Sequence, residues 1–171
     1  MMLPDRISHP RGMRHQWEGN LSIPMRVRDN PLSGRPYSQI LLDSNFIIAL
    51  LRKHRDLEDE IKAEIRGKIA IVVLDLVVWE LERLARIRSS ETATWAKAGL
   101  AFLSERNYPI AEHKPGPPDV DASLIAFALT EKILTGIATI DRELKSALDS
   151  LGIPSILPRT SHGLVAEGFH L

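Results

Sequence analysis

From about residue 38 onward, short apolar runs alternate with longer segments of helical periodicity. The runs lie at residues 39–43, 68–75, 136–140 and 153–158, with a weaker one at 108–113. They have the length of buried strands, and the segments between them have the length of helices. Strands that alternate with helices form a parallel sheet covered on both faces. We therefore predict an α/β fold with three layers, α/β/α, around a central parallel sheet.

Glycine and proline mark the limits of several of these elements. Gly67 and Gly152 follow amphipathic stretches, as glycine commonly does after the last turn of a helix. Residues 114–118, KPGPP, interrupt the chain between the weak strand and the next helix. The predicted helices cover residues 44–54, 57–67, 76–87, 91–106, 119–133 and 141–152.

The first 37 residues differ in composition from the rest of the chain. They contain five Pro, three Gly, six Arg and three acidic residues, which gives a net charge of 6 − 3 = +3. The remainder has 16 basic and 19 acidic residues, a net charge of −3. We predict an irregular basic arm over residues 1–37 and one folded domain over residues 38–171. Whether the arm contacts RNA or lies on the body is left open at this point.

Composition excludes several classes of protein. No apolar run approaches the roughly 20 residues that span a membrane, and no secretory signal is recognisable, so a soluble cytoplasmic protein is expected. The absence of cysteine excludes disulfides and thiolate metal sites. No glycine-rich nucleotide loop, GxSxG elbow or HExxH motif occurs, and the six His are scattered and expected at the surface.

Two of the predicted strands end in an aspartate that is followed by a helix. Asp43 follows QILL and Asp141 follows GIATI. Because ligands of open α/β sheets bind beyond the carboxyl ends of the strands, both acids are expected at the functional edge. The alternative is that each only caps the following helix. Asp75 shows the same pattern and is expected to be such a cap.

Two further acids fall on apolar faces of predicted helices. Glu80 shares its face with Leu84 and Ile87, and Asp121 shares its face with Leu124. Burying a carboxylate among aliphatic side chains costs several kcal/mol unless a cation or hydrogen bonds compensate. An ion pair with Arg is the alternative for Glu80. Asp119 is the natural N-cap of the helix that carries Asp121, and a metal ligand is its alternative role.

Clustered carboxylates are a typical holder for hard divalent cations. Mg²⁺ and Mn²⁺ take oxygen ligands and bind phosphates, whereas such a cluster without an ion would repel itself and any phosphate. With an ion, the cluster can activate water and stabilise the charge of a phosphoryl displacement. The pattern therefore favours metal-assisted hydrolysis of a phosphate ester.

The order of the four acids resembles that of PIN-domain ribonucleases over residues 38 to about 165. The matching stretches are LLDSN, VVWELERL, DVDASLIAFA and IATIDRELKSALDSLGIPSILPR, of which the last is the most specific. The last stretch looks closer to the archaeal and eukaryotic pre-rRNA-processing branch than to VapC-type toxins, which share the same acids. A phosphatase of the haloacid dehalogenase type fits less well, because its second aspartate is Asn45 here.

The resemblance implies a PIN-like nuclease domain that cleaves single-stranded RNA with Mg²⁺ or Mn²⁺ and leaves a 3′-hydroxyl and a 5′-phosphate. It assigns the catalytic and metal-binding roles to Asp43, Glu80, Asp121 and Asp141, with Asp119 as an additional acid. Ser44, Asn45 and Thr139 carry over as polar neighbours of the ion site. The cations expected to bind RNA are Arg142, Arg159, Arg52, Lys53 and Arg55.

Three biological roles are compatible with the resemblance. The first is an endoribonuclease of rRNA or other RNA processing, expected as a homodimer without a membrane partner. The second is a VapC-type toxin, which would pair with an antitoxin. The third is a PIN domain that no longer cleaves and serves as an RNA-binding or assembly scaffold, although the complete set of acids argues against it.

Overall fold

A computed structural model describes residues 38–113, 119–160 and 162–169. The described residues all fall within one compact unit. The predicted arm, residues 1–37, and the KPGPP segment, residues 114–118, lie outside the described part of the chain. None of the helices in the described part is long and apolar enough to cross a membrane.

Six strands form one sheet in the order β3-β2-β1-β4-β5-β6. The first five run parallel, which confirms the predicted α/β fold with a parallel sheet. β1 lies in the middle, with Leu41 opposite Val72 of β2 and Ile137 of β4. The strands are β1 (Ser38–Leu42), β2 (Ile69–Leu74), β3 (Ile110–Ala111), β4 (Leu134–Ala138), β5 (Ser155–Pro158) and β6 (Leu164–Glu167).

The sixth strand departs from the prediction. β6 pairs antiparallel with β5, and the backbone N–H of Arg159 donates to the carbonyl of Gly163 at 2.9 Å in the turn between them. Gly163 has φ +87°, a conformation that glycine adopts without strain. A strand of four residues is too short for its periodicity to be read from the sequence, so β6 was not predicted, and the central parallel sheet gains one antiparallel edge strand.

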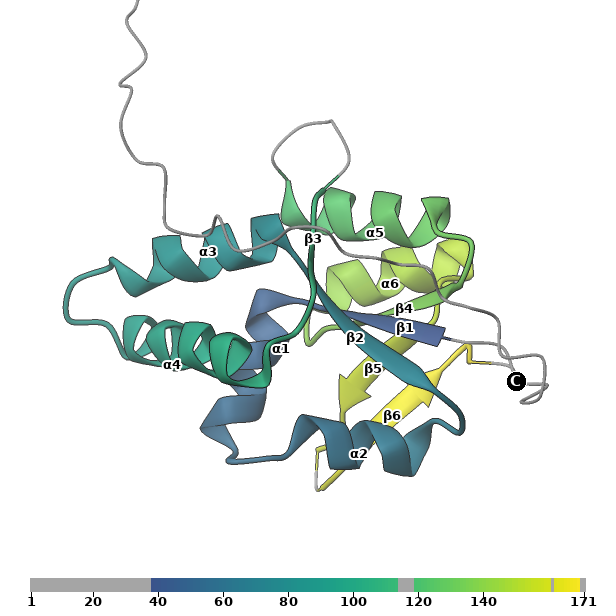
Figure 1. Ribbon diagram of the computed structural model, residues 1–171, viewed down its shortest axis with the longest axis horizontal. Helices are drawn as coiled ribbons and strands as arrows, with labels where there is room; N and C mark the ends of the chain where they lie inside the picture. The colour runs from purple at the N-terminus through teal and green to yellow at the C-terminus, as the bar shows by residue number, and fades with distance from the viewer. Residues whose placement is uncertain (1–37, 114–118, 161, 170–171) are drawn as a thin grey trace, which may run out of the picture. The chain divides into compact units, whose positions relative to one another are not determined.

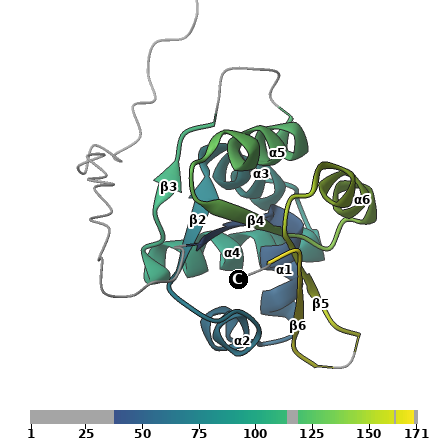
Figure 2. The ribbon, with the colours of Figure 1, turned by 90° about the vertical axis from the view of Figure 1, so that its right-hand side faces the viewer.

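In the described part of the chain, six helices cover the sheet. Figure 2 shows α5 and α6 on one side of the sheet and α1, α2 and α4 on the other. α3 and α4 form a helical hairpin, and α3 also contacts α1 and α5 (Figure 1). The three layers predicted from the sequence are therefore present. The helices are α1 (Ser44–Arg52), α2 (Leu57–Glu64), α3 (Asp75–Ala85), α4 (Glu91–Arg106), α5 (Val120–Thr130) and α6 (Arg142–Leu151).

The predicted helix ends are partly confirmed. Gly152 closes α6 in the left-handed conformation with φ +68°. Gly67, in contrast, lies beyond the end of its helix, because Ile65 already has extended backbone and buries its side chain in the core. Gly67 instead turns the chain toward β2 with φ +116°.

The core lies around β1, whose five residues are all buried, including Ser38 and Gln39. The amide of Gln39 donates to Thr135 Oγ1 on β4 at 2.9 Å, which satisfies this polar group inside the sheet. Gly99 of α4 lets the helices on that face approach closely, since a Cβ there would lie 3.3 Å from Ile47 Cγ2 and 3.5 Å from Leu81 Cδ2. This close packing fixes α3, and with it Glu80, relative to β1.

Candidate active site at the carboxyl edge of the sheet

The centre of the candidate site lies where β1 and β4 end side by side. Leu42 is opposite Ala138 in the parallel register, and the backbone N–H of Asp43 donates to the carbonyl of Ala138 at 3.0 Å. The residues that follow the two strands, Asp43 and Thr139, therefore meet at the carboxyl edge, as predicted for Asp43. The pairing joins segments that are 96 residues apart in the chain.

Asp43 is a buried carboxylate whose nearest side-chain partner in the described residues is the Thr139 hydroxyl. Its residue is 2% exposed, and Thr139 Oγ1 donates to Oδ2 at 2.9 Å. Although Asp43 occupies the N-cap position of α1, its side chain makes no capping hydrogen bond there. Burial raises the pKa of Asp43 to about 6, the Thr139 hydroxyl opposes this shift, and the charges of Asp121 and Glu80 add to it. The charged form of the carboxylate is thus destabilised by burial and by neighbouring charges, which Thr139 and the backbone of Asn45 offset only in part.

Glu80 is brought to Asp43 by Ser44. The Ser44 hydroxyl donates a hydrogen bond to the Glu80 carboxylate, and Ser44 Oγ also lies 3.5 Å from Asp43 Oδ1. The Glu80 side chain is 23% exposed, and its nearest cation is Arg83, with Nη2 at 3.9 Å from Oε1. The predicted apolar face around Glu80 is only partly formed, because Ile87 at its far end is exposed.

Asp121 lies in the first turn of α5 and is exposed, so the prediction that it is buried in an apolar stripe is wrong. Leu124, one turn further along the helix, is fully buried, whereas Asp121 in the first turn is open to water. Partial removal of its carboxylate from water still raises the pKa of Asp121, and the charges of Asp141, Asp119 and Glu80 raise it further. Asp121 therefore belongs electrostatically to the cluster around Asp43.

Asp119 and Asp141 both cap helices. Asp119 Oδ1 accepts from the backbone N–H of Ala122 at 3.0 Å, which confirms its predicted role as the N-cap of α5. Asp141 Oδ1 accepts from the N–H groups of Glu143 and Leu144 at 2.7 and 3.1 Å. The Asp141 N–H in turn donates to Thr139 Oγ1 at 3.0 Å. Capping by one oxygen leaves the Asp141 carboxylate at the sheet edge, where it also acts on Asp121.

The third predicted polar neighbour, Asn45, lies in the first turn of α1 and is exposed. Ser44 and Thr139 contact the acids directly, whereas no hydrogen bond of the Asn45 side chain joins it to the described residues. Its role in holding the Asp43 loop stays a prediction.

Sequence reasoning missed a contact at the neighbouring strand ends. Asp75 begins α3, and its Oδ1 accepts from the backbone N–H of Leu76 at 2.8 Å and of His113 at 3.0 Å. His113 Nδ1 lies 2.9 Å from the same oxygen. The N-cap of α3 is Leu74, so the prediction that Asp75 caps this helix is wrong. Asp75 instead ties the end of β3 to the end of β2, and His113 is half-buried rather than a free surface residue. The contact follows from the pairing of β2 with β3, and no pattern in the sequence indicated that pairing.

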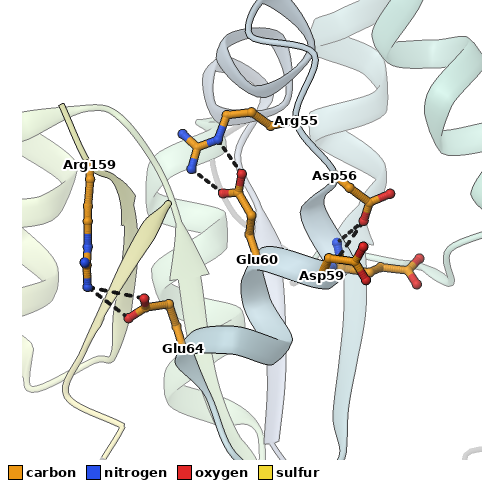
Figure 3. Close-up of polar contacts among 7 residues, drawn as sticks. Arg55, Asp56, Asp59, Glu60, Glu64 and Arg159 are labelled. Carbon is orange, nitrogen blue, oxygen red and sulfur yellow. Dashed lines mark hydrogen bonds and ion pairs between the residues drawn. The ribbon is translucent and has the colours of Figure 1, made fainter. Parts of the chain in front are cut away.

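The predicted RNA-binding cations fall into two groups. Arg55 pairs with Glu60, and Arg159 Nη2 lies 3.2 Å from Glu64 Oε1, as Figure 3 shows. Arg52 Nη2 lies 3.1 Å from Glu91 Oε1. Lys53 and Arg142, in contrast, have no ion-pair partner among the described residues. Arg142 is exposed at the first position of α6, directly after Asp141.

The donor set fits a hard divalent cation that keeps part of its water shell. No three acidic or histidine side chains in the described part of the chain are arranged to hold one ion directly. Mg²⁺, however, is commonly held by one or two carboxylates and several waters. Asp43 and Glu80, linked through Ser44, supply two carboxylates. Burial is the main cause of the raised pKa of Asp43, and a cation between the two carboxylates would favour the charged form and relieve their repulsion.

The fold and the carboxylates at its sheet edge define an α/β domain of the PIN type. No family model matches the chain. A solved structure, that of the PIN domain endonuclease Utp24, matches with a TM-score of 0.64 and 21% sequence identity, and the match covers 77% of this chain and 92% of that one. A likeness at this identity establishes the fold.

Sequence similarity extends the relationship. Ribonuclease VapC4 of Methanocaldococcus jannaschii is 29% identical over 121 residues, which cover 71% of this chain and 90% of that protein. Both matches confirm the resemblance to PIN-domain ribonucleases drawn from the four motifs.

Proposed function

We propose that this protein is a divalent-metal-dependent endoribonuclease that hydrolyses phosphodiester bonds of RNA. The observation that carries the proposal is the chain of contacts from Glu80 through Ser44 to Asp43, and from Asp43 through Thr139 to Asp141. These contacts gather carboxylates whose charges disfavour one another. Similarity to Ribonuclease VapC4 supports RNA as the substrate.

The residues of the site would divide the work. Asp43 and Glu80 would hold Mg²⁺ or Mn²⁺, with Asp121 and Asp141 acting on the same ion or its waters and Asp119 at the margin. A bound ion of this kind lowers the pKa of water and neutralises charge on the reacting phosphate. Thr139 and Ser44 fix the Asp43 and Glu80 carboxylates in place, so that little rearrangement is needed during hydrolysis. The exposed Arg142 guanidinium is available to a phosphate beside them.

Cleavage of single-stranded RNA with Mn²⁺ or Mg²⁺ tests the proposal. Asp43→Asn and Asp141→Asn should each lower kcat/KM by about 100-fold or more, as expected when a group that acts on the transition-state charge is removed. Asp149→Asn is the matched control, because Asp149 is exposed on α6, the helix that Asp141 caps, and its ion-pair partner among the described residues is Lys145. Unchanged cleavage by the two site variants would show that the site is assigned wrongly.

For the biological role we propose processing of rRNA or another cellular RNA. The similarity to Ribonuclease VapC4 favours a second candidate, a toxin with an antitoxin partner. Growth arrest on expression of the parent, but not of Asp141→Asn, would identify the toxin. RNA crosslinked in the cell to Asp141→Asn would identify a processing substrate. If the parent binds RNA but cleaves none, the third role applies, that of a non-cleaving scaffold.

The predicted homodimer and cytoplasmic location stay predictions. Light scattering of the purified protein gives its mass in solution, and cell fractionation gives its compartment.

A further inference from the structure

The exposed side of the α3–α4 hairpin carries an aromatic ring and several cations that the proposed active site does not use. Trp79 on α3 is 52% exposed, although a tryptophan side chain is usually largely covered. It is the immediate neighbour of Glu80 in the chain. An exposed aromatic ring beside a residue of the candidate active site requires an explanation.

Two arginines continue the same helix face. Arg83 and Arg86 lie four and seven residues after Trp79, a spacing that places all three side chains on one side of the helix. Their side chains are 55% and 75% exposed. Each has only a distant carboxylate nearby, Glu80 at 3.9 Å from Arg83 and Glu82 at 3.8 Å from Arg86. Exposed pairs of this kind contribute little and exchange easily for another anion.

This face leads into an open groove between the end of α3 and the start of α4. The groove has a volume of about 460 Å³, and Arg86, Arg88 and Lys97 line it together with Ser89 and Ser90. Arg88 and Lys97 have no ion-pair partner among the described residues. The Ser90 side chain makes no capping hydrogen bond to α4, so its hydroxyl can donate elsewhere.

The charge of the groove is opposite to that of the domain. Its three cations face one acid, Glu91, which gives 3 − 1 = +2, whereas residues 38–171 carry a net charge of −3. Glu91 is itself engaged by Arg52 at 3.1 Å. A groove with this surplus is complementary to phosphates. A protein interface, by comparison, is typically depleted in lysine and apolar at its centre.

We infer that the exposed face of α3, from Trp79 through Arg83 and Arg86 into the groove, is the path of single-stranded RNA leaving the active site. A base stacks on Trp79, and backbone phosphates contact Arg86, Arg88 and Lys97. Trp79 and Arg86 are about 10 Å apart along the helix axis at 1.5 Å per residue. Stacking on aromatic rings combined with a basic groove is how proteins hold single strands without reading their sequence. The inference rests on the proposed function.

Substrate length provides the first test. Arg88→Ala/Lys97→Ala should cut a dinucleotide as fast as the parent, because a dinucleotide at the acids does not reach the groove. With a long single-stranded RNA, its kcat/KM should fall, and the slope of log(kcat/KM) against log[salt] should flatten by about 1.4, roughly 0.7 for each lost phosphate contact. The control is Arg66→Ala/Lys68→Ala, which removes the same charge from exposed residues before β2, at the opposite edge of the sheet.

Trp79 provides the second test. Trp79→Ala should weaken binding of an uncleavable single-stranded RNA, measured by fluorescence anisotropy, by about tenfold or more, as loss of one stacked base does. Trp79→Phe should keep most of the affinity, since a ring remains. Circular dichroism checks that each variant is folded, which is expected because the side chain is half-exposed.

The outcomes separate this inference from the proposed function. If the parent neither binds nor cuts RNA, both are overturned. If the parent cuts RNA and the groove and Trp79 variants behave like their controls, the path along α3 is wrong and the active site stands. A dimer that dissociates in Trp79→Ala while RNA affinity is kept would make this face a protein interface and overturn the path.

Discussion

Thr139 Oγ1 donates a hydrogen bond of 2.9 Å to Asp43 Oδ2, and this bond joins the residues that directly follow β4 and β1. The same hydroxyl accepts from the backbone N–H of Asp141 at 3.0 Å. Because the Asp141 N–H occupies a lone pair of Oγ1, the hydroxyl proton is directed to Asp43. One fully buried threonine thus orients one acid and fixes the backbone of another.

Thr139→Val removes this hydroxyl at nearly constant shape. The pKa of Asp43 should rise above its value of about 6, because a hydrogen bond to a charged group, about 1.5–3 kcal/mol, is lost. The acidic limb of the pH profile of kcat/KM should move to higher pH, while Thr139→Ser should keep the parent profile. An unmoved limb in Thr139→Val would show that Thr139 does not act through the Asp43 carboxylate.

Stability should depend on pH through Asp43. The pKa of Asp43 is about 6 in the folded protein, whereas the ordinary value of an aspartate, expected in the unfolded chain, is 3.8. The folded state therefore binds this proton more tightly than the unfolded state. The free energy of unfolding should therefore fall as pH rises from about 4 to 6, by about 3 kcal/mol for two pKa units, and stay lower above that range. Asp43→Asn should lack this decline and be more stable than the parent at pH 7. Urea titrations of both proteins across this range measure the difference.

A divalent cation should restore the free energy of unfolding that is lost when Asp43 becomes charged. At pH 7, Mn²⁺ at 100 times its Kd should stabilise the parent by about 2.7 kcal/mol, and a chelator should remove the effect. Mn²⁺ should stabilise Asp43→Asn and Glu80→Gln much less than it stabilises the parent. The melting temperature with and without Mn²⁺ reports this without any RNA. Equal shifts in parent and variants would place the ion elsewhere.

Arg142 and Arg159 should contribute differently to RNA binding, although both lie in the last stretch that resembles PIN-domain ribonucleases. Arg159 is engaged with Glu64, whereas Arg142 is exposed next to Asp141 without an ion pair in the described residues. Arg142→Ala should lower kcat/KM more than Arg159→Ala at low salt, and the difference should shrink as salt rises. Equal losses would mean that Arg159 leaves Glu64 when RNA binds.

Gly136 makes the middle of β4 sensitive to size. A Cβ at this position would lie 3.1 Å from Cε1 of Phe169 and closer still to its Cζ. Gly136→Ala should therefore destabilise the protein by about 1–3 kcal/mol, the usual range for overpacking. Phe169→Ala should relieve most of that cost, so a double-mutant cycle of unfolding free energies should show strong coupling. Additive effects would indicate that the ring moves aside freely.

The fold was predictable where its strands are long and apolar. β1, β2, β4 and β5 stand out as runs of aliphatic residues, and their alternation with helices determines a parallel sheet. β6 is four residues long and follows a turn, so nothing in its own sequence distinguishes it from a loop. The short β3 was visible only as a weak run.

The site was predictable to the extent that it follows from strand ends. Asp43 lies at the sheet edge because it directly follows β1, and Asp141 lies there because it comes shortly after β4, with its backbone N–H bonded to Thr139. Helical phase failed for Asp121, because a residue in the first turn of a helix can project beyond the layer that buries the later turns. The contacts of Asp75 with His113, and of Arg159 with Glu64, join distant segments and depend on the packed structure.

The adjacency of β1 and β4 also bears on biosynthesis. Asp43 leaves the ribosome well before its hydroxyl partner Thr139, which is made 96 residues later, and only the pairing of β4 with β1 brings the two together. A nascent chain that stops before β4 lacks both Thr139 and Asp141. Cleaving capacity of the proposed kind therefore cannot arise before β4 and the residues after it have been translated.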